Sequence, residues 1–183
     1  MQKKLTRELT ACALLAALMC IGAFLYIPLV VPISLQTLVL FSALFIFGGR
    51  LTSISVGVYI LLGAIGLPVF SGFSGGVARL FDATGGYIFG MLLAALLWWL
   101  LEVALPKSDK YRIMNSVMSL LVIYLFGTLW FTFVYAGGEK TLGVILTTCV
   151  LPFIIPDLVK IYLAYYISKK GAVTFGKTEK DRK

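Results

Sequence analysis

Asp157 and Lys160 lie three residues apart in a long apolar stretch, and their types and spacing suit ligand binding. The stretch reads LGVILTTCVLPFIIPDLVKIYLAYYI and contains no other side chain that is charged at neutral pH. A charge at membrane depth costs roughly 2.5–3.5 kcal/mol on insertion scales, so it faces a partner, a cavity or a ligand. The spacing places both side chains on one helical face. The pair is therefore part of a polar ligand site or a structural ion pair that fixes helix packing.

Two prolines lie just before this pair. Pro152 and Pro156 lack a backbone N–H, so each leaves a carbonyl of the preceding turn without its helical hydrogen bond. Broken helices of this kind border cavities in membrane proteins. Because Asp157 directly follows Pro156, we expect it in the first turn of a helix that restarts there. The prolines favour the ligand site over the structural ion pair.

Polar residues elsewhere in the chain can complete a site of this kind. Gln36 and Thr37 stand where another apolar segment begins, and Arg79 and Tyr87 belong to the surroundings of a glycine-rich loop. Arg79 has a second interpretation, as a solvated loop charge that pairs with Asp82. The sequence leaves both interpretations of Arg79 open.

The chain contains no histidine, and this limits the chemistry it can perform. The commonest metal ligand is missing and no Cys/Asp/Glu cluster replaces it, so we expect neither a metal site nor a cofactor. Residues 72–75 read GFSG and resemble the GxSG motif of rhomboid-type intramembrane proteases. Without histidine, Ser74 would need Lys160 as its base and an oxyanion hole. An intramembrane Ser–Lys hydrolase is the alternative from another class of protein.

Residues 171–178 match the phosphate-loop pattern GxxxxGK[ST] by chance. That loop needs a preceding buried strand and a following helix, whereas a membrane helix precedes this match. We expect no ATPase activity from the chain itself.

The elements that must position these residues are membrane helices. The 183 residues are 60% hydrophobic and 13% charged with a mean hydropathy of +0.99, which indicates an all-α polytopic membrane protein. The net charge of +8 is not arranged as a nucleic-acid-binding face, because the charges cluster at the ends of apolar runs. Six helices are expected, at residues 8–27, 37–47, 52–67, 87–105, 113–136 and 142–167.

The segments between these helices have distinct compositions. The linker 28–36 contains two prolines and is expected to be a loop or a short re-entrant piece. Loop 68–86 is rich in glycine, and loops of that length in compact domains are functional or disordered. Its aromatic and apolar residues argue against disorder. Residues 1–170 are predicted to form one membrane domain, and the basic tail 171–183 is predicted to be disordered.

The distribution of basic residues tests the six-helix arrangement. An even number of helices places both termini on one side, which we predict to be cytoplasmic because basic residues concentrate there. Loop 68–86 is then outside. The other side has only Arg79 and Lys140, with Lys160 in the membrane. The cytoplasmic side is expected to hold thirteen basic residues: Lys3, Lys4, Arg7, Arg50, Lys107, Lys110, Arg112, Lys169, Lys170, Lys177, Lys180, Arg182 and Lys183.

Two pairs of small residues suggest close helix contacts. Ala13 and Ala17 lie four apart on the first helix, and Gly86 and Gly90 lie four apart on the fourth. Such ridges let helices approach closely. We expect internal packing for the glycine pair, whereas the alanine pair alone does not distinguish internal packing from a partner interface.

Two stretches of the sequence carry a family resemblance. Residues 31–90 read VPISLQTLVLFSALFIFGGRLTSISVGVYILLGAIGLPVFSGFSGGVARLFDATGGYIFG, and residues 152–164 read PFIIPDLVKIYLA. Both closely resemble the BioY family, the biotin-specific S-components of energy-coupling-factor (ECF) transporters. The likeness covers about residues 5–170 and includes Asp157, Lys160, Gln36 and Arg79 at the family's polar positions.

The resemblance implies a fold, a function and partners. It implies a six-helix protein of the prokaryotic plasma membrane that binds biotin from outside and is not an enzyme. It also implies a transmembrane coupling subunit and two cytoplasmic ATPases, which consume the ATP. Family members dock on the coupling subunit through small residues of the first helix, a pattern that Ala13 and Ala17 fit. An S-component for another vitamin stays an alternative, because fold does not fix the ligand.

Biotin suits the polar residues already named. Asp157 can accept a hydrogen bond from a ureido N–H, Lys160 can donate to the ureido carbonyl or neutralise Asp157, and Gln36 can do either. Arg79 suits the carboxylate of the ligand. The opposite assignment, with Lys160 on the carboxylate, stays open. The aromatic residues that could cover the apolar ring are Phe70, Phe73 and Tyr87.

Overall fold

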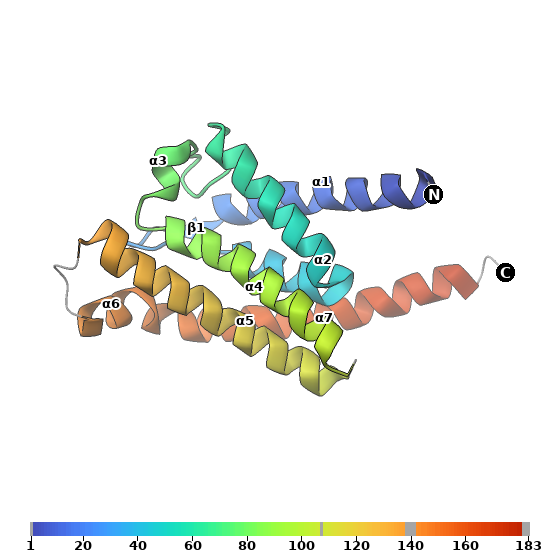
Figure 1. The fold of residues 1–183 in the computed structure, drawn as a ribbon. Helices are drawn as coiled ribbons and strands as arrows, with labels where there is room; N and C mark the ends of the chain where they lie inside the picture. The colour runs from blue at the N-terminus through green and yellow to red at the C-terminus, as the bar shows by residue number, and fades with distance from the viewer. Residues whose placement is uncertain (1, 107, 138–141, 181–183) are drawn as a thin grey trace.

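The structure, a computed structural model, describes residues 2–106, 108–137 and 142–180. Long helices form a bundle, with a short hairpin and a small helix at one end (Figure 1). Helix α4 packs against α5 and α2, and α1 and α7 each pack against α2. The elements are α1 (Gln2–Phe24), β1 (Tyr26–Ile27), β2 (Ile33–Ser34), α2 (Gln36–Ala64), α3 (Val77–Leu80), α4 (Gly85–Ala104), α5 (Asp109–Trp130), the π-helix η1 (Phe131–Tyr135), α6 (Leu142–Cys149) and α7 (Leu151–Lys180).

The membrane character expected from composition is present in the helices. Within the described residues, five helical stretches are long and apolar enough to cross a membrane. They are Leu5–Phe24, Gln36–Ala64, Gly85–Ala104, Asp109–Tyr135 and Gly143–Lys170. Their exposed surfaces carry many large apolar side chains, as lipid-facing helices do.

Helix α2 contains the second and third helices expected from the sequence. Gly48 in its middle has φ +79° and ψ 175°, which is not helical. The side chains of Gln36 and Tyr59 nevertheless meet, with 2.7 Å between Nε2 and the hydroxyl oxygen. A straight helix rises about 1.5 Å per residue and would hold these two residues roughly 35 Å apart. Helix α2 therefore consists of two halves that fold back on each other at Gly48.

Two charged side chains satisfy the backbone at this reversal. The Glu102 carboxylate accepts a hydrogen bond from the Gly49 N–H at 2.8 Å, where the second half of α2 begins. The Arg112 guanidinium donates to the Phe45 carbonyl, where the first half ends. An anion at a helix N-terminus and a cation at a C-terminus both complement the helix dipole. These contacts tie α2 to the end of α4 and the start of α5.

The helices α4 and α5 approach closely through glycine, as expected for Gly86 and Gly90. A Cβ atom on Gly86 would lie 2.2 Å from the Cβ of Trp130, and one on Gly90 would lie 3.1 Å from the Cα of Ile123. Any side chain at Gly86 would therefore push α5 away. The internal-packing interpretation of this glycine pair is confirmed.

The linker and the glycine-rich loop are both structured. The linker contains an antiparallel hairpin in which Tyr26 pairs with Ser34 and Ile27 with Ile33. The glycine-rich loop contains α3 and a bridge between Phe70 and Ser74. Figure 1 shows the hairpin and α3 at the same end of the bundle.

The last helix differs in two ways from the sequence-based expectation. The break lies at Val150, between α6 and α7, and Pro156 lies inside α7 without ending it. Asp157 is therefore in the second turn of a helix that begins at Leu151, not in the first turn of one that restarts at Pro156. Pro152, the second residue of α7, is tolerated because the first N–H groups of a helix have no intrahelical partner, whereas Pro156 leaves the Pro152 carbonyl without its helical hydrogen bond. The tail was expected to be disordered, whereas α7 continues as helix to Lys180, with no proline after Pro156 to stop it.

Candidate ligand-binding site

A polar cavity lies within the bundle, near the end that carries the hairpin and α3. The empty space among its lining residues, open solvent at the mouth included, is about 620 Å³. The residues around it come from the hairpin, α2, the glycine-rich loop, α4, α5 and α7. The polar residues that line it are Ser34, Gln36, Thr37, Tyr59, Ser71, Thr84, Tyr87, Tyr124, Asp157 and Lys160.

Asp157 is the most buried charge in this cavity, with 2% of the residue exposed. Its Oδ1 accepts hydrogen bonds from the Thr37 hydroxyl and the Lys160 ammonium, both at 2.8 Å. Its Oδ2 accepts one from the Tyr124 hydroxyl, also at 2.8 Å. A carboxylate has about four acceptor positions, so the described contacts leave one on Oδ2. Asp157 can therefore accept one more donor without giving up a protein contact.

Lys160 is satisfied by the protein and has no such position left. The residue is 7% exposed. Its ammonium donates to Asp157 Oδ1 at 2.8 Å, to the Ser34 carbonyl at 2.8 Å and to Thr37 Oγ1 at 3.1 Å. An ammonium has three N–H donors, and each has an acceptor among the described residues. The charge of Lys160 is thus held against Asp157 and the hairpin.

Gln36 is oriented by a chain of hydrogen bonds. Its Nε2 donates to the Tyr59 hydroxyl at 2.7 Å, and that hydroxyl donates to the Val69 carbonyl at 3.2 Å. Its Oε1 accepts from the Ser34 hydroxyl at 3.1 Å. Among the described residues, the second N–H and the second lone pair of the amide have no partner, so both can meet a ligand.

Tyr87 and Phe70 contribute aromatic surface to the cavity. The Tyr87 hydroxyl donates to the Cys149 carbonyl at 3.0 Å, at the break between α6 and α7. Phe70 is 1% exposed and meets the Tyr59 ring edge-on, with 5.5 Å between the centroids. The apolar part of the lining is completed by Val31, Pro32, Ile88, Met91, Ile123 and Phe153.

Arg79 lies outside this group of residues. Among the described residues it lines an adjoining outer hollow of about 750 Å³ rather than the main cavity. It forms an ion pair with Asp82, as the second interpretation of the sequence expected. The two spaces share Pro32, Ser71 and Thr84, so Arg79 stands at the mouth of the cavity.

Two residues of the glycine-rich loop do not lie where the sequence suggested. Phe73 was one of three aromatic residues that could cover a ligand, and it is 67% exposed and stacks on Phe24 of α1 at 4.2 Å between centroids. Ser74 donates to the Ser71 carbonyl at 2.8 Å, and the described lining of the cavity that holds Lys160 does not include it. The loop geometry thus gives no support to a Ser–Lys pair.

Sequence reasoning did not identify Tyr59 and Tyr124 as site residues. Both hydroxyls belong to the hydrogen-bond network around Asp157 and Gln36. The sequence could have indicated these two tyrosines, because a tyrosine within a membrane helix needs a hydrogen-bond partner for its hydroxyl. The Ser34 carbonyl gave no signal, since every residue has a backbone carbonyl.

The sequence and the fold both have close counterparts among known proteins. The model of the BioY family matches residues 1–177. A probable biotin transporter BioY from Pyrococcus horikoshii is 38% identical over 90% of this chain and 95% of its own length. The biotin transporter BioY from Thermotoga maritima is 34% identical over 88% of this chain and 94% of its own length.

A solved structure shares the fold as well. The crystal structure of the S-component for biotin from an ECF-type ABC transporter matches with a TM-score of 0.81 and 27% identity. The match covers 93% of this chain and 93% of that chain.

Proposed function

This chain belongs to the BioY family, and from that membership and its polar cavity we propose that it is a biotin-specific S-component of an ECF-type transporter. It binds biotin, delivers it inward and does not change it chemically, so it is not an enzyme. The observation that carries the proposal is the buried Asp157–Lys160 pair, which lines the cavity and, among the described contacts, keeps one acceptor position of Asp157 free.

The geometry favours one orientation of the ligand. The ureido ring carries two N–H donors, which Asp157 Oδ2 and the free lone pair of Gln36 can accept. The remaining Gln36 N–H can donate to the ureido carbonyl. The apolar ring then lies against the cavity's aromatic and aliphatic wall, which includes Phe70, Met91 and Tyr87.

The carboxylate of biotin points the other way, to Arg79 at the mouth. At Lys160 it would meet an ammonium whose N–H groups are already used, and it would lie beside the Asp157 carboxylate. Two carboxylates at one site repel each other. Lys160 therefore neutralises Asp157, and Arg79 binds the carboxylate of the ligand.

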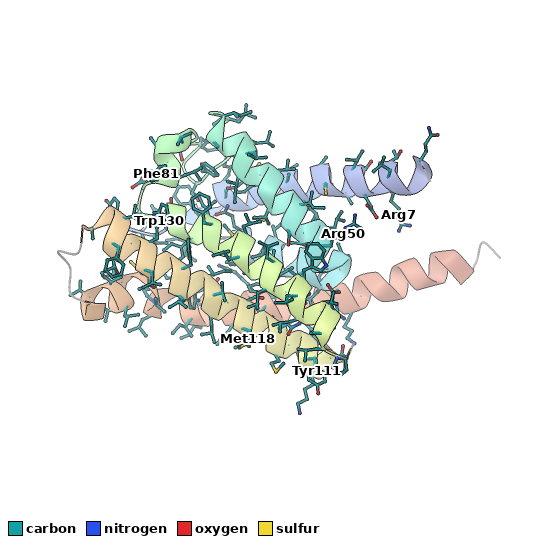
Figure 2. All side chains as sticks on the ribbon, viewed as in Figure 1. Arg7, Arg50, Phe81, Tyr111, Met118 and Trp130 are labelled. Carbon is teal, nitrogen blue, oxygen red and sulfur yellow. The ribbon has the colours of Figure 1, made fainter. Side chains whose placement is uncertain are left out.

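The helices cross the plasma membrane six times in this proposal, with both halves of α2 counted. Figure 1 supports it, because α1 starts and α7 ends at the end of the bundle where α2 reverses and α4 meets α5. Arg7 and Arg50 lie toward that end in Figure 2. Basic residues mark the cytoplasmic side, so both termini are cytoplasmic and the hairpin, α3 and the cavity mouth face outside.

The coupling subunit docks on α1, and two ATPases bound to it consume ATP. Ala13 and Ala17 are exposed on α1, while Ala16 and Met19 on the same helix are buried against the bundle. A ridge of small, exposed residues allows a partner helix to approach closely. The face of α1 that carries Ala13 and Ala17 is therefore available to the coupling subunit.

Calorimetry of the purified protein tests the ligand. Titration with biotin, thiamine and riboflavin should give a binding isotherm with biotin alone. Binding of thiamine or riboflavin without biotin would identify an S-component for another vitamin. The absence of any biotin binding would refute the proposal.

A further inference from the structure

Arg79 and Asp82 form an ion pair at the mouth of the cavity, on α3 and the turn that follows it. Both residues line the outer hollow, which adjoins the main cavity along Pro32, Ser71 and Thr84. A ligand that extends from the main cavity toward this hollow reaches the ion pair.

Asp82 is held in place by its own loop. Its Oδ1 accepts a hydrogen bond from the Ala83 N–H at 2.7 Å, and its Oδ2 accepts from the Arg79 guanidinium. The two side chains are 34% and 32% exposed, so water reaches the pair. An ion pair with this much exposure is weak enough for another anion to compete with it.

Arg79 keeps donors that Asp82 does not use. A guanidinium has five N–H donors, and the Nε of Arg79 is buried without a hydrogen-bond partner among the described residues. A buried donor without a partner costs free energy, which a second acceptor would recover. The arginine is therefore only partly satisfied by Asp82.

We infer that Asp82 competes with the carboxylate of the ligand for Arg79 and so sets the preference of the site between an acid and its neutral amide. The inference rests on the proposed function, in which Arg79 binds the carboxylate of biotin. A docking carboxylate must share the guanidinium with Asp82, and the two negative charges repel each other. Asp82 thus weakens binding of the acid and does not affect a ligand without that charge.

The variant Asp82→Asn tests this inference by calorimetry with biotin and biotinamide. Asparagine has nearly the same shape and keeps an acceptor for the Ala83 N–H, but it removes the charge. The affinity for biotin should rise about two- to fivefold, as expected for a partly exposed ion pair. The affinity for biotinamide should stay at the wild-type value.

Two further variants make the result interpretable. Asp82→Ser also removes the charge and keeps a hydroxyl acceptor, and it replaces Asp82→Asn if that protein does not fold. Asp109→Asn is the matched control, because Asp109 also pairs with a basic residue, Lys169, but does so in an exposed position on α5. It should leave both affinities unchanged.

Each outcome decides between the inference and its alternatives. Unchanged or weaker biotin binding in both Asp82 variants would overturn the inference, since Asp82 would then position Arg79 rather than compete for it. An equal change for biotin and biotinamide would overturn it as well. If the wild-type protein does not bind biotin at all, the proposed function fails first, whatever the variants do.

Discussion

The Asp157 carboxylate and the Lys160 ammonium neutralise each other and also line the cavity. The two interpretations of the pair, a ligand site or a structural clamp, are therefore compatible. The pair holds α7 against Thr37 and Ser34 at the start of α2 and in the hairpin. A ligand that uses the free position on Asp157 Oδ2 adds to this network without breaking it.

Replacing Asp157 separates these two roles. Asp157→Asn should weaken biotin binding by about 10- to 100-fold, because a hydrogen bond donated to a charged acceptor is worth roughly 1.5–3 kcal/mol. The same change leaves the Lys160 charge unpaired and should lower the melting temperature in detergent. Calorimetry and thermal unfolding measure the two effects.

The double variant Asp157→Asn with Lys160→Met is the control for stability. Methionine has a similar length and carries no charge, so the melting temperature should recover relative to Asp157→Asn. Biotin binding should stay weak, since the charged carboxylate acceptor is still replaced by a neutral amide. Wild-type affinity in the double variant would show that the pair is structural only.

Tyr124 positions Asp157 by donating to its Oδ2. Tyr124→Phe removes this hydroxyl and should weaken biotin binding severalfold, because a typical hydrogen bond contributes about 0.5–1.5 kcal/mol. Tyr162→Phe is the matched control, since Tyr162 is 68% exposed on the outside of α7. Calorimetry should show equal affinities for Tyr162→Phe and wild type. Equal losses in both variants would contradict a specific role for Tyr124.

At the scale of an element, α2 supplies two antiparallel helices from one stretch of sequence. The apolar pattern predicted two separate helices there, at residues 37–47 and 52–67. The structure shows how the chain reverses between them. Gly48 has a positive φ, and Glu102 and Arg112 satisfy the backbone on its two sides.

Gly49 is required by the close approach of α4. A Cβ atom there would lie 2.4 Å from the Cα and backbone N of Trp99. Gly49→Ala should therefore lower the melting temperature in detergent, because neither backbone can move freely. The free energy of unfolding should fall by about 1–3 kcal/mol, as it does at other overpacked positions.

Gly57 provides a matched comparison on the same helix. The structure describes no heavy atom within 4 Å of a Cβ placed there. Gly57→Ala should keep or raise the melting temperature, since alanine is favoured over glycine in a helix by roughly 1 kcal/mol. Similar losses in both variants would show that the contact with Trp99 is not the cause.

At the scale of the whole molecule, the bundle has two chemically different ends. The hairpin, α3 and the cavity mouth occupy one end, and the start of α1 and the end of α7 lie at the other (Figure 1). In the proposed function the first end receives biotin and the exposed face of α1 meets the coupling subunit. Ligand binding and partner docking thus use separate surfaces.

A bulky residue on α1 should separate these two activities. Ala13→Trp should leave biotin binding by the isolated protein unchanged. It should prevent copurification with the coupling subunit, because the bulky side chain keeps a partner helix from approaching the small residues of α1. Val103→Trp is the control, since Val103 is 78% exposed on α4. It should affect neither binding nor copurification. Loss of biotin binding in Ala13→Trp would assign Ala13 to internal packing instead.

The sequence alone indicated most of the site's charged and amide residues. Asp157, Lys160 and Gln36 were identified because a polar side chain in an apolar run must have a partner. Tyr87, which the sequence also suggested for the site, lines the same cavity. The sequence did not indicate that Phe73 stacks on Phe24, because that contact depends on where α1 ends relative to the loop.

Hydrophobicity and charge along the chain determined the membrane class and the ranges of the long helices, because lipid selects apolar runs whatever their neighbours are. Which atoms meet was decided only by the tertiary structure. Tyr124 reaches Asp157 from 33 residues away, and Ser34 reaches Lys160 from 126 residues away. Such contacts depend on how the helices pack, and neither periodicity nor spacing records that packing. The packing alone decides that Lys160 is satisfied within the protein while Asp157 keeps a position for a ligand.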